Sequence, residues 1–115
     1  MKDTNVAVIV GEVITDPVSK TLANGDTVVN CDIAAVSDEG RHVVPLVLSG
    51  AVGSLSVGDR ICAVGFMRKR FFQSPAGLQS RTELAVRKSA RVRQKAQTQK
   101  IMNEAVQDLR GASRV

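Results

Sequence analysis

The 115-residue chain contains no tryptophan, no tyrosine and only three phenylalanines. A hydrophobic core must therefore be built from valine, leucine, isoleucine and alanine. No apolar run approaches the roughly 20 residues that span a bilayer, and the first residues lack the profile of a signal peptide. We expect a cytoplasmic protein with no membrane contact, folded as one domain with a modest core.

Residues for catalysis and for metal binding are also scarce. The single histidine, His42, has no second histidine or cysteine at ligand spacing. The sequence has no clustered carboxylate site and no phosphate-binding glycine loop followed by lysine. We therefore expect a protein that is not an enzyme and that needs no metal or cofactor. Cys31 and Cys62 lie in apolar stretches, and we expect buried, reduced thiols rather than a disulfide.

Charge is divided unevenly along the chain. Residues 1–59 carry three basic and eight acidic side chains (net −5), whereas residues 60–115 carry thirteen basic and three acidic ones (net +10). The densest stretch runs from Arg60 to Lys95, where only Glu83 opposes ten basic residues. Such concentrated positive charge is typical of proteins that bind polyanions, because neutralising phosphates releases condensed counterions.

Two adjacent aromatic residues lie inside this basic stretch. Phe71 and Phe72 directly follow Arg68, Lys69 and Arg70. Bases stack on aromatic faces while cations hold the phosphate backbone, so the combination indicates a protein that binds single-stranded nucleic acid. Charge alone is equally compatible with a solvated basic face and two phenylalanines in a core.

The hydrophobic pattern along most of the chain is that of β-strands. Valines alternate with other apolar residues up to Gly11, and glycine within a strand suits a bulge or a sharp bend. Pro45 lacks a backbone N–H, which places its strand at an edge or in a bulge. The predicted strands cover residues 6–13, 27–36, 42–48, 60–67 and 78–92.

The connections between these strands are short, with two exceptions. Residues 71–77 are predicted as a long hairpin loop that carries both adjacent phenylalanines, and residues 49–57 have room for a single helical turn. Five short strands with no long helix among them indicate a small closed all-β barrel.

The C-terminal part has a different pattern. Residues 94–110 are rich in Gln, Lys and Ala, with apolar residues at helical spacing, and Leu109-Arg110-Gly111 has the form of a helix stop. An isolated helix of this length is marginal, so we expect it to pack on the barrel or on a neighbouring subunit; a frayed tail is the alternative. The predicted division is a binding domain over residues 1–93 and a basic helical tail over residues 94–115.

An ordered set of residues resembles bacterial single-stranded DNA-binding proteins. The match opens with the run 5–11, includes Ala34 and the second predicted strand, and covers roughly residues 4–92 in total. The other residues that carry it are Asp16, Pro17, Gly25, the run 58–61, Gly65, Arg70, Phe72, Gly77, Arg81, Thr82 and Glu83. The resemblance implies a five-stranded oligonucleotide/oligosaccharide-binding (OB) barrel that assembles as a homotetramer and coats single-stranded DNA in replication, recombination and repair.

Two features depart from that family. Its third strand presents stacking aromatics, whereas residues 42–50 here are aliphatic around Pro45 and are more similar to the primosomal replication protein of the N or B type, a dimeric relative. Residues 111–115 carry one basic side chain, Arg114, and no Phe, in contrast to the acidic tip with a terminal Phe, so we do not expect the chain to recruit repair enzymes by that route. A paralogue, a version carried by a phage or mobile element, or an accessory factor fits these differences.

We therefore expect binding of single-stranded DNA without strong sequence preference, by base stacking and phosphate contacts. An accessory primosome-type interaction module and an RNA-binding OB protein stay open as alternatives. Replication or repair proteins are expected as further partners, and a nucleoid-associated location follows. The candidate binding residues are Lys20, Arg41, Arg68, Lys69, Arg70, Phe71, Phe72, Arg81, Arg87 and Lys88.

Within this set, Phe72 matches a stacking position of the family, and Lys20 matches a basic position in its first long turn. Arg68 and Arg70 lie two residues apart, so they should share one strand face with Lys69 opposite. We also expect a homo-oligomer, with a tetramer favoured over a dimer. Its interface is predicted on the first and third strands, through Val6, Val8, Val10, Val43 and Val47.

Overall fold

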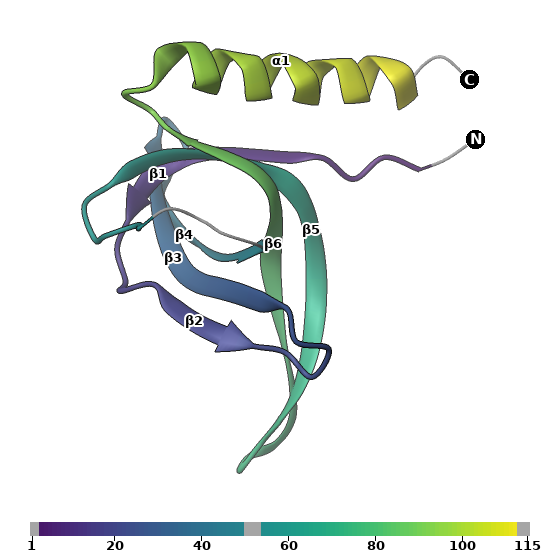
Figure 1. Ribbon diagram of the computed structural model, residues 1–115. Coiled ribbons are helices and arrows are strands. Elements are labelled where there is room, and N and C mark those ends of the chain that lie inside the picture. Colours follow the sequence, from purple (N-terminus) through teal and green to yellow (C-terminus); the bar gives the residue numbers. More distant parts are fainter. Residues whose placement is uncertain (1–2, 50–53, 113–115) are drawn as a thin grey trace.

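The computed structural model describes residues 3–49 and 54–112 and shows a β-barrel with one helix packed outside it (Figure 1). The helix lies across one end of the barrel, and a long two-stranded arm projects from the other end. The elements in chain order are β1 (Ala7–Val13), β2 (Val18–Thr21), β3 (Thr27–Ser37), β4 (Gly40–Ser49), β5 (Arg60–Ser74), β6 (Gly77–Arg91) and α1 (Lys95–Ala112).

Five strands close the barrel in the order β1-β5-β6-β4-β3, and β1 returns to β3. The closing contact is short: Glu12 pairs with Ala34 and Val13 with Ile33. The neighbours are antiparallel except β4 and β6, which run parallel. The predicted all-β, five-stranded barrel with a short C-terminal helix is therefore confirmed.

Two glycines permit backbones to approach closely where the barrel bends. A Cβ on Gly11 would lie 2.3 Å from the carbonyl oxygen of Ala34, beside the closing contact. A Cβ on Gly65 would lie 1.8 Å from the carbonyl oxygen of Ala85, at a register shift between Val64 and Gly65. Neither position can hold a side chain unless the backbone moves, so glycine is required at both.

The barrel interior is aliphatic, as the lack of large aromatics requires. Alternate residues of each strand point inward, and the buried cluster consists of Val13, Cys31, Ile33, Leu46, Leu48, Ile61, Ala63, Leu84 and Val86. Cys31 and Cys62 are free and buried, as predicted. Burial raises the pKa of both thiols, and the charge of Asp32 raises that of Cys31 further.

Helix α1 covers the outer surface of β5 and β6 through a second apolar cluster. Ile101 and Ala105 are each 2% exposed and pack with Cys62, Val64 and Ala90. The predicted helix thus packs on its own barrel, and it continues to Ala112 instead of stopping at Gly111. Among the described residues, no helix combines the length and the hydropathy needed to cross a membrane.

This packing corrects part of the predicted subunit interface. Val6 and Val10 pack against the cluster under α1, and Val47 is only 8% exposed. These three valines are used within the chain. Val8 and Val43 remain about half exposed and are available for an interface.

The largest correction concerns residues 71–77, which were predicted to form a long loop. They belong to the arm: β5 runs to Ser74, β6 starts at Gly77, and only two residues form the turn between them. Gly77 has a φ of +111°, and the hydroxyl of Ser74 donates to its carbonyl oxygen. A glycine at positive φ directly after the two turn residues lets the hairpin close there, so no longer loop is needed.

Two smaller differences follow from local chemistry, and the prediction for Pro45 is confirmed. β2 was missed because all four of its residues are exposed and carry no apolar alternation. The predicted helical turn over residues 49–57 lies partly outside the described residues, and positions 54–57 are not helical. Pro45 pairs with Asp32 on β3, while the pairing of β4 with β6 starts at Leu46, so the strand has one neighbour at the proline.

Candidate nucleic-acid interface

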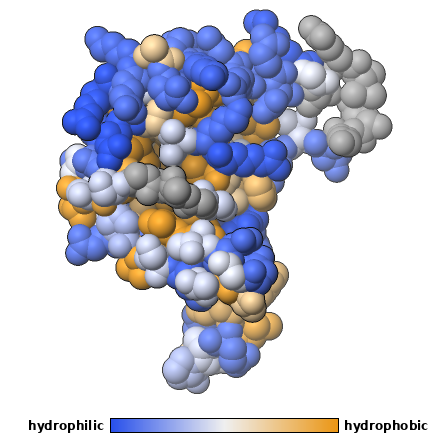
Figure 2. All heavy atoms as spheres, in the orientation of Figure 1, coloured by the Kyte–Doolittle hydropathy of each residue, from blue (hydrophilic) through white to orange (hydrophobic). Residues whose placement is uncertain are grey.

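The β5–β6 arm carries most of the residues that the sequence assigns to binding. It is a paired ribbon in which Arg68 lies opposite Glu83, and Arg70 lies opposite Arg81. Its root is held by Asn5, whose side-chain amide donates to the carbonyl oxygen of Met67 (2.7 Å) and accepts from its N–H (3.1 Å). Figure 2 shows the arm projecting from the barrel with hydrophilic and apolar residues side by side.

The two faces of the arm differ in what they present. Arg68, Arg70 and Phe72 lie on one face, because successive strand residues point to opposite sides. Lys69 and Phe71 lie on the other face, where Phe71 is 64% exposed and Leu78 is 70% exposed. The spacing argument for the two arginines is thus correct, and the adjacent phenylalanines point in opposite directions.

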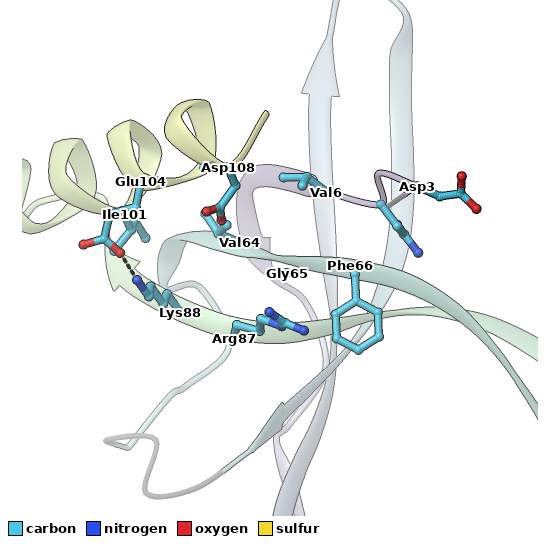
Figure 3. Close-up of a pocket in the computed structure, with 12 residues that line it drawn as sticks. Asp3, Val6, Val64, Gly65, Phe66, Arg87, Lys88, Ile101, Glu104 and Asp108 are labelled. Atoms are coloured by element: carbon cyan, nitrogen blue, oxygen red, sulfur yellow. Dashed lines mark ion pairs between the residues drawn. The ribbon is translucent and has the colours of Figure 1, made fainter. Parts of the chain in front are cut away.

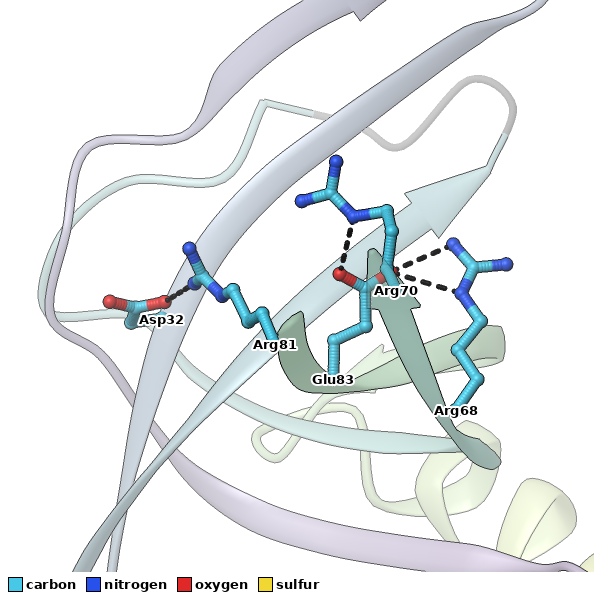
Figure 4. A network of polar contacts seen from close by, with 5 residues as sticks. All are labelled: Asp32, Arg68, Arg70, Arg81 and Glu83. Atoms are coloured by element: carbon cyan, nitrogen blue, oxygen red, sulfur yellow. Dashed lines mark hydrogen bonds and ion pairs between the residues drawn. The ribbon is translucent and has the colours of Figure 1, made fainter. Parts of the chain in front are cut away.

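A buried carboxylate connects the two arginines (Figure 4). Glu83 is 1% exposed; its Oε2 accepts from Nε of Arg68 (3.0 Å), and its Oε1 accepts from Nε of Arg70 (3.0 Å). The Arg70 guanidinium also lies over the Phe72 ring, 5.8 Å from its centroid. These four side chains form one network, which we call the arm network.

A small cavity opens beside the arm network. It has a volume of about 70 Å³ and is lined by Lys20 and Leu22 of the first hairpin, Val28 and Asn30 of β3, Val47 of β4, and Arg68, Arg70 and Glu83. Three cations and one carboxylate therefore border an apolar floor. Because β2 supplies Lys20, the cavity needs strands that are far apart in sequence.

Further along the same side of the barrel, Arg81 is paired with Asp32 of β3. Its Nη2 donates to Oδ1 of Asp32 at 2.9 Å, and both side chains are partly exposed. Exposed pairs of this kind contribute little to stability and are screened by salt. Arg81 can exchange this partner for a phosphate at little cost.

The remaining sequence candidates lie elsewhere. Arg87 and Lys88 border a cavity of about 410 Å³ between α1 and the barrel (Figure 3). Arg87 lies over the Phe66 ring, 5.1 Å from its centroid, and Lys88 forms an ion pair with Glu104 of α1. Arg41 pairs with Val36 near the far end of β4. The ten candidates therefore lie in four places: on the side of the arm that carries the arm network, on the opposite face of the arm, beside helix α1, and at the end of the barrel where β3 turns into β4.

Sequence reasoning missed how much of the positive charge is already paired. Carboxylates pair with Arg68, Arg70, Arg81, Lys88 and Arg91. Glu83 was noticed only as the one acid in the basic stretch, and nothing in its neighbours showed that it would be buried. Within residues 3–49 and 54–112, no group of His, Cys, Asp or Glu side chains could hold a metal ion.

No family model and no curated protein matches the sequence. Among solved structures, the dimeric structure of the N-terminal domain of PriB protein from Thermoanaerobacter tencongensis aligns with a TM-score of 0.61 and 19% identity. The match covers 76% of this chain and 94% of that chain. The chain has an OB fold. At this identity the likeness concerns the fold alone.

Proposed function

We propose that the protein binds single-stranded DNA without strong sequence preference and without catalysis, in replication, recombination or repair in the cytoplasm. The observation that carries this proposal is the cavity beside the arm network: Lys20, Arg68 and Arg70 border it, and the half-buried Phe72 lies on the same face of the arm as the two arginines. Cations beside an aromatic ring are the combination that holds a backbone and stacks a base. We assign this activity to residues 1–93 and treat 94–115 as a tail that packs on the domain.

A titration of labelled oligo-dT, oligo-rU and duplex at several salt concentrations tests this proposal. We expect oligo-dT to bind more tightly than duplex. If the three cations of the cavity each contact one phosphate, log affinity should fall against log salt with a slope of about −2, since each single-stranded contact contributes roughly −0.7. Equal affinity for duplex, or a slope near zero, would contradict the proposal.

Two alternatives are outcomes of the same titration. An accessory primosome-type module is favoured by the fold shared with the PriB domain and by the outer face of β3 and β4, which holds no aromatic residue among those described. Weak binding to every oligonucleotide would support it. An RNA-binding role would appear as a preference for oligo-rU, which requires a contact to the 2′-hydroxyl.

We also propose that the protein is a homo-oligomer built from dimers. Within the described residues, β1 pairs with β5 along Ala7–Glu12, whereas its pairing with β3 begins only at Glu12, so the rest of its second edge is open. An open edge beside the half-exposed Val8 is suited to pairing with a second copy. The PriB domain with the same fold is a dimeric structure.

Val8→Lys should convert the oligomer to a monomer, because edge lysines block strand pairing. Light scattering at micromolar concentration measures the change directly and also distinguishes a dimer from a tetramer. Val106→Lys is the matched control: Val106 is about as exposed as Val8 but lies on α1, outside the sheet. A parent protein that scatters as a monomer would contradict the assembly proposal.

A further inference from the structure

Glu83 is an unusual residue to bury. It is the only charged side chain among the described residues that is fully buried, at 1% exposure. Removing a carboxylate from water costs several kcal/mol, and a pair with arginine only partly offsets that cost. An apolar residue would serve packing at this position at least as well. The cost therefore indicates a role beyond the stability of the barrel.

The geometry of the arm network shows what that role is. Two guanidinium groups two residues apart on one strand face repel each other, and each would be mobile without a partner. Glu83 offers one oxygen to each: Nε and Nη2 of Arg68 meet Oε2, while Nε of Arg70 meets Oε1. Figure 4 shows the terminal nitrogens of Arg70 turned away from the carboxylate. These donors stay available for a second acceptor.

The available donors border a space of suitable size. The cavity of about 70 Å³ accommodates roughly five water-sized groups, the number of non-hydrogen atoms in one phosphate. Lys20 lines it together with the two arginines, and Val28 and Val47 provide apolar walls. A planar guanidinium binds phosphate oxygens in pairs when its orientation is fixed.

We propose that Glu83 is a positioning residue that holds Arg68 and Arg70 for a phosphodiester group of the bound strand, in a subsite completed by Lys20. This inference rests on the proposed function, because it names the chemical group of the single strand, a phosphodiester, that the face of the arm network binds. Glu83 itself does not touch the strand. It acts by limiting the orientations of the two guanidinium groups before the strand arrives.

For the loss of the Glu83 charge, the proposal predicts a change in DNA affinity opposite to the one that charge repulsion alone predicts. Removing a negative charge from a polyanion-binding face should strengthen binding, because repulsion of the phosphates decreases. If Glu83 positions the arginines, its loss should weaken binding instead. A glutamine at this position would also turn an N–H donor toward one of the two guanidinium groups, which has no acceptor to offer.

Glu83→Gln and Asp32→Asn form a matched pair for this test. Both remove one negative charge next to an arginine, but the Asp32–Arg81 pair is exposed and Glu83 is buried. We expect Glu83→Gln to weaken oligo-dT binding about tenfold, without a steeper salt slope. Asp32→Asn should strengthen binding about twofold. Tighter binding by both variants would overturn the proposal.

Arg70→Lys covers the case in which Glu83→Gln does not fold. Arg70 is 43% exposed, so its substitution leaves the core intact, and the net charge is unchanged. Lysine cannot contact Glu83 through Nε and keep a planar fork for the phosphate. We expect oligo-dT affinity to fall severalfold. Affinity equal to the parent would overturn the positioning role whatever Glu83→Gln does.

The parent protein distinguishes failure of this inference from failure of the proposed function. If the parent binds oligo-dT with salt dependence, and Glu83→Gln binds more tightly or Arg70→Lys binds like the parent, the function stands and the positioning role is wrong. If the parent does not bind oligo-dT, the proposed function is wrong and the phosphate subsite is wrong with it.

Discussion

Phe72→Ala is expected to weaken binding to oligo-dT by about 1–3 kcal/mol, which is roughly a five- to 150-fold loss of affinity. Phe72 is the one aromatic in the arm network and shares its strand face with Arg68 and Arg70. Phe66, on the same face of β5, lies under Arg87 on the helix side. A base stacked on its ring would lie beside a backbone held by the two arginines. Since stacking releases no counterions, the slope of log affinity against log salt should stay nearly unchanged.

Phe71→Ala is the matched control for this prediction. It removes the same side chain from the adjacent residue, on the face of the arm that points away from the cavity. If the strand follows the arm network, Phe71→Ala should bind almost like the parent. Comparable losses in both variants would show that the strand wraps around the arm. Parental affinity of Phe72→Ala, with the fold intact by circular dichroism, would contradict the stacking role.

Arg70→Ala should show the complementary pattern. It should lower the salt slope by about 0.7, the contribution of one phosphate contact to a single strand. Glu83 would retain Arg68 as a partner, so the buried charge is not left unpaired. With Phe72 as the one aromatic in the arm network, we expect affinity to depend more on salt than in a relative that stacks several bases.

The second large effect is expected on stability. Ile101→Ala should lower the free energy of unfolding by about 2–5 kcal/mol, because Ile101 is 2% exposed and packs in the cluster that joins α1 to the barrel. Thermal or urea denaturation followed by circular dichroism measures this loss. Val106→Ala is the control: Val106 lies on the same helix but is 44% exposed, so its loss should be small.

Binding should respond differently from stability in these variants. Helix α1 and the arm lie at opposite ends of the barrel, so oligo-dT affinity of folded Ile101→Ala should stay within a few-fold of the parent. The same holds for truncation after Val92, provided that the truncated chain remains folded. A collapse of oligo-dT binding in a folded, oligomeric truncate would move the binding site to the tail.

Local pattern was sufficient for much of the fold and for part of the site. Alternating apolar residues predict strands because each strand has one face in the core. The four-residue spacing of Ile101 and Ala105 predicts the helix because it places both residues on one side, which is the side that the structure buries. The two-residue spacing of Arg68 and Arg70 places them on one face whatever lies around them. The hairpin end was mispredicted because residues 71–74 lie outside the core and pair with β6 by main-chain hydrogen bonds, which leave little trace in hydropathy.

By itself, the sequence determined the barrel class, the C-terminal helix and the concentration of positive charge in the second half, because these depend on neighbours along the chain. Only the tertiary structure decided which of these positive charges are paired with carboxylates. Glu83 neutralises part of Arg68 and Arg70, Asp32 reaches Arg81 from β3, and Glu104 reaches Lys88 from α1. Pairing between side chains depends on distances of a few ångströms across strands that are far apart in sequence, and charge counts contain no information on those distances.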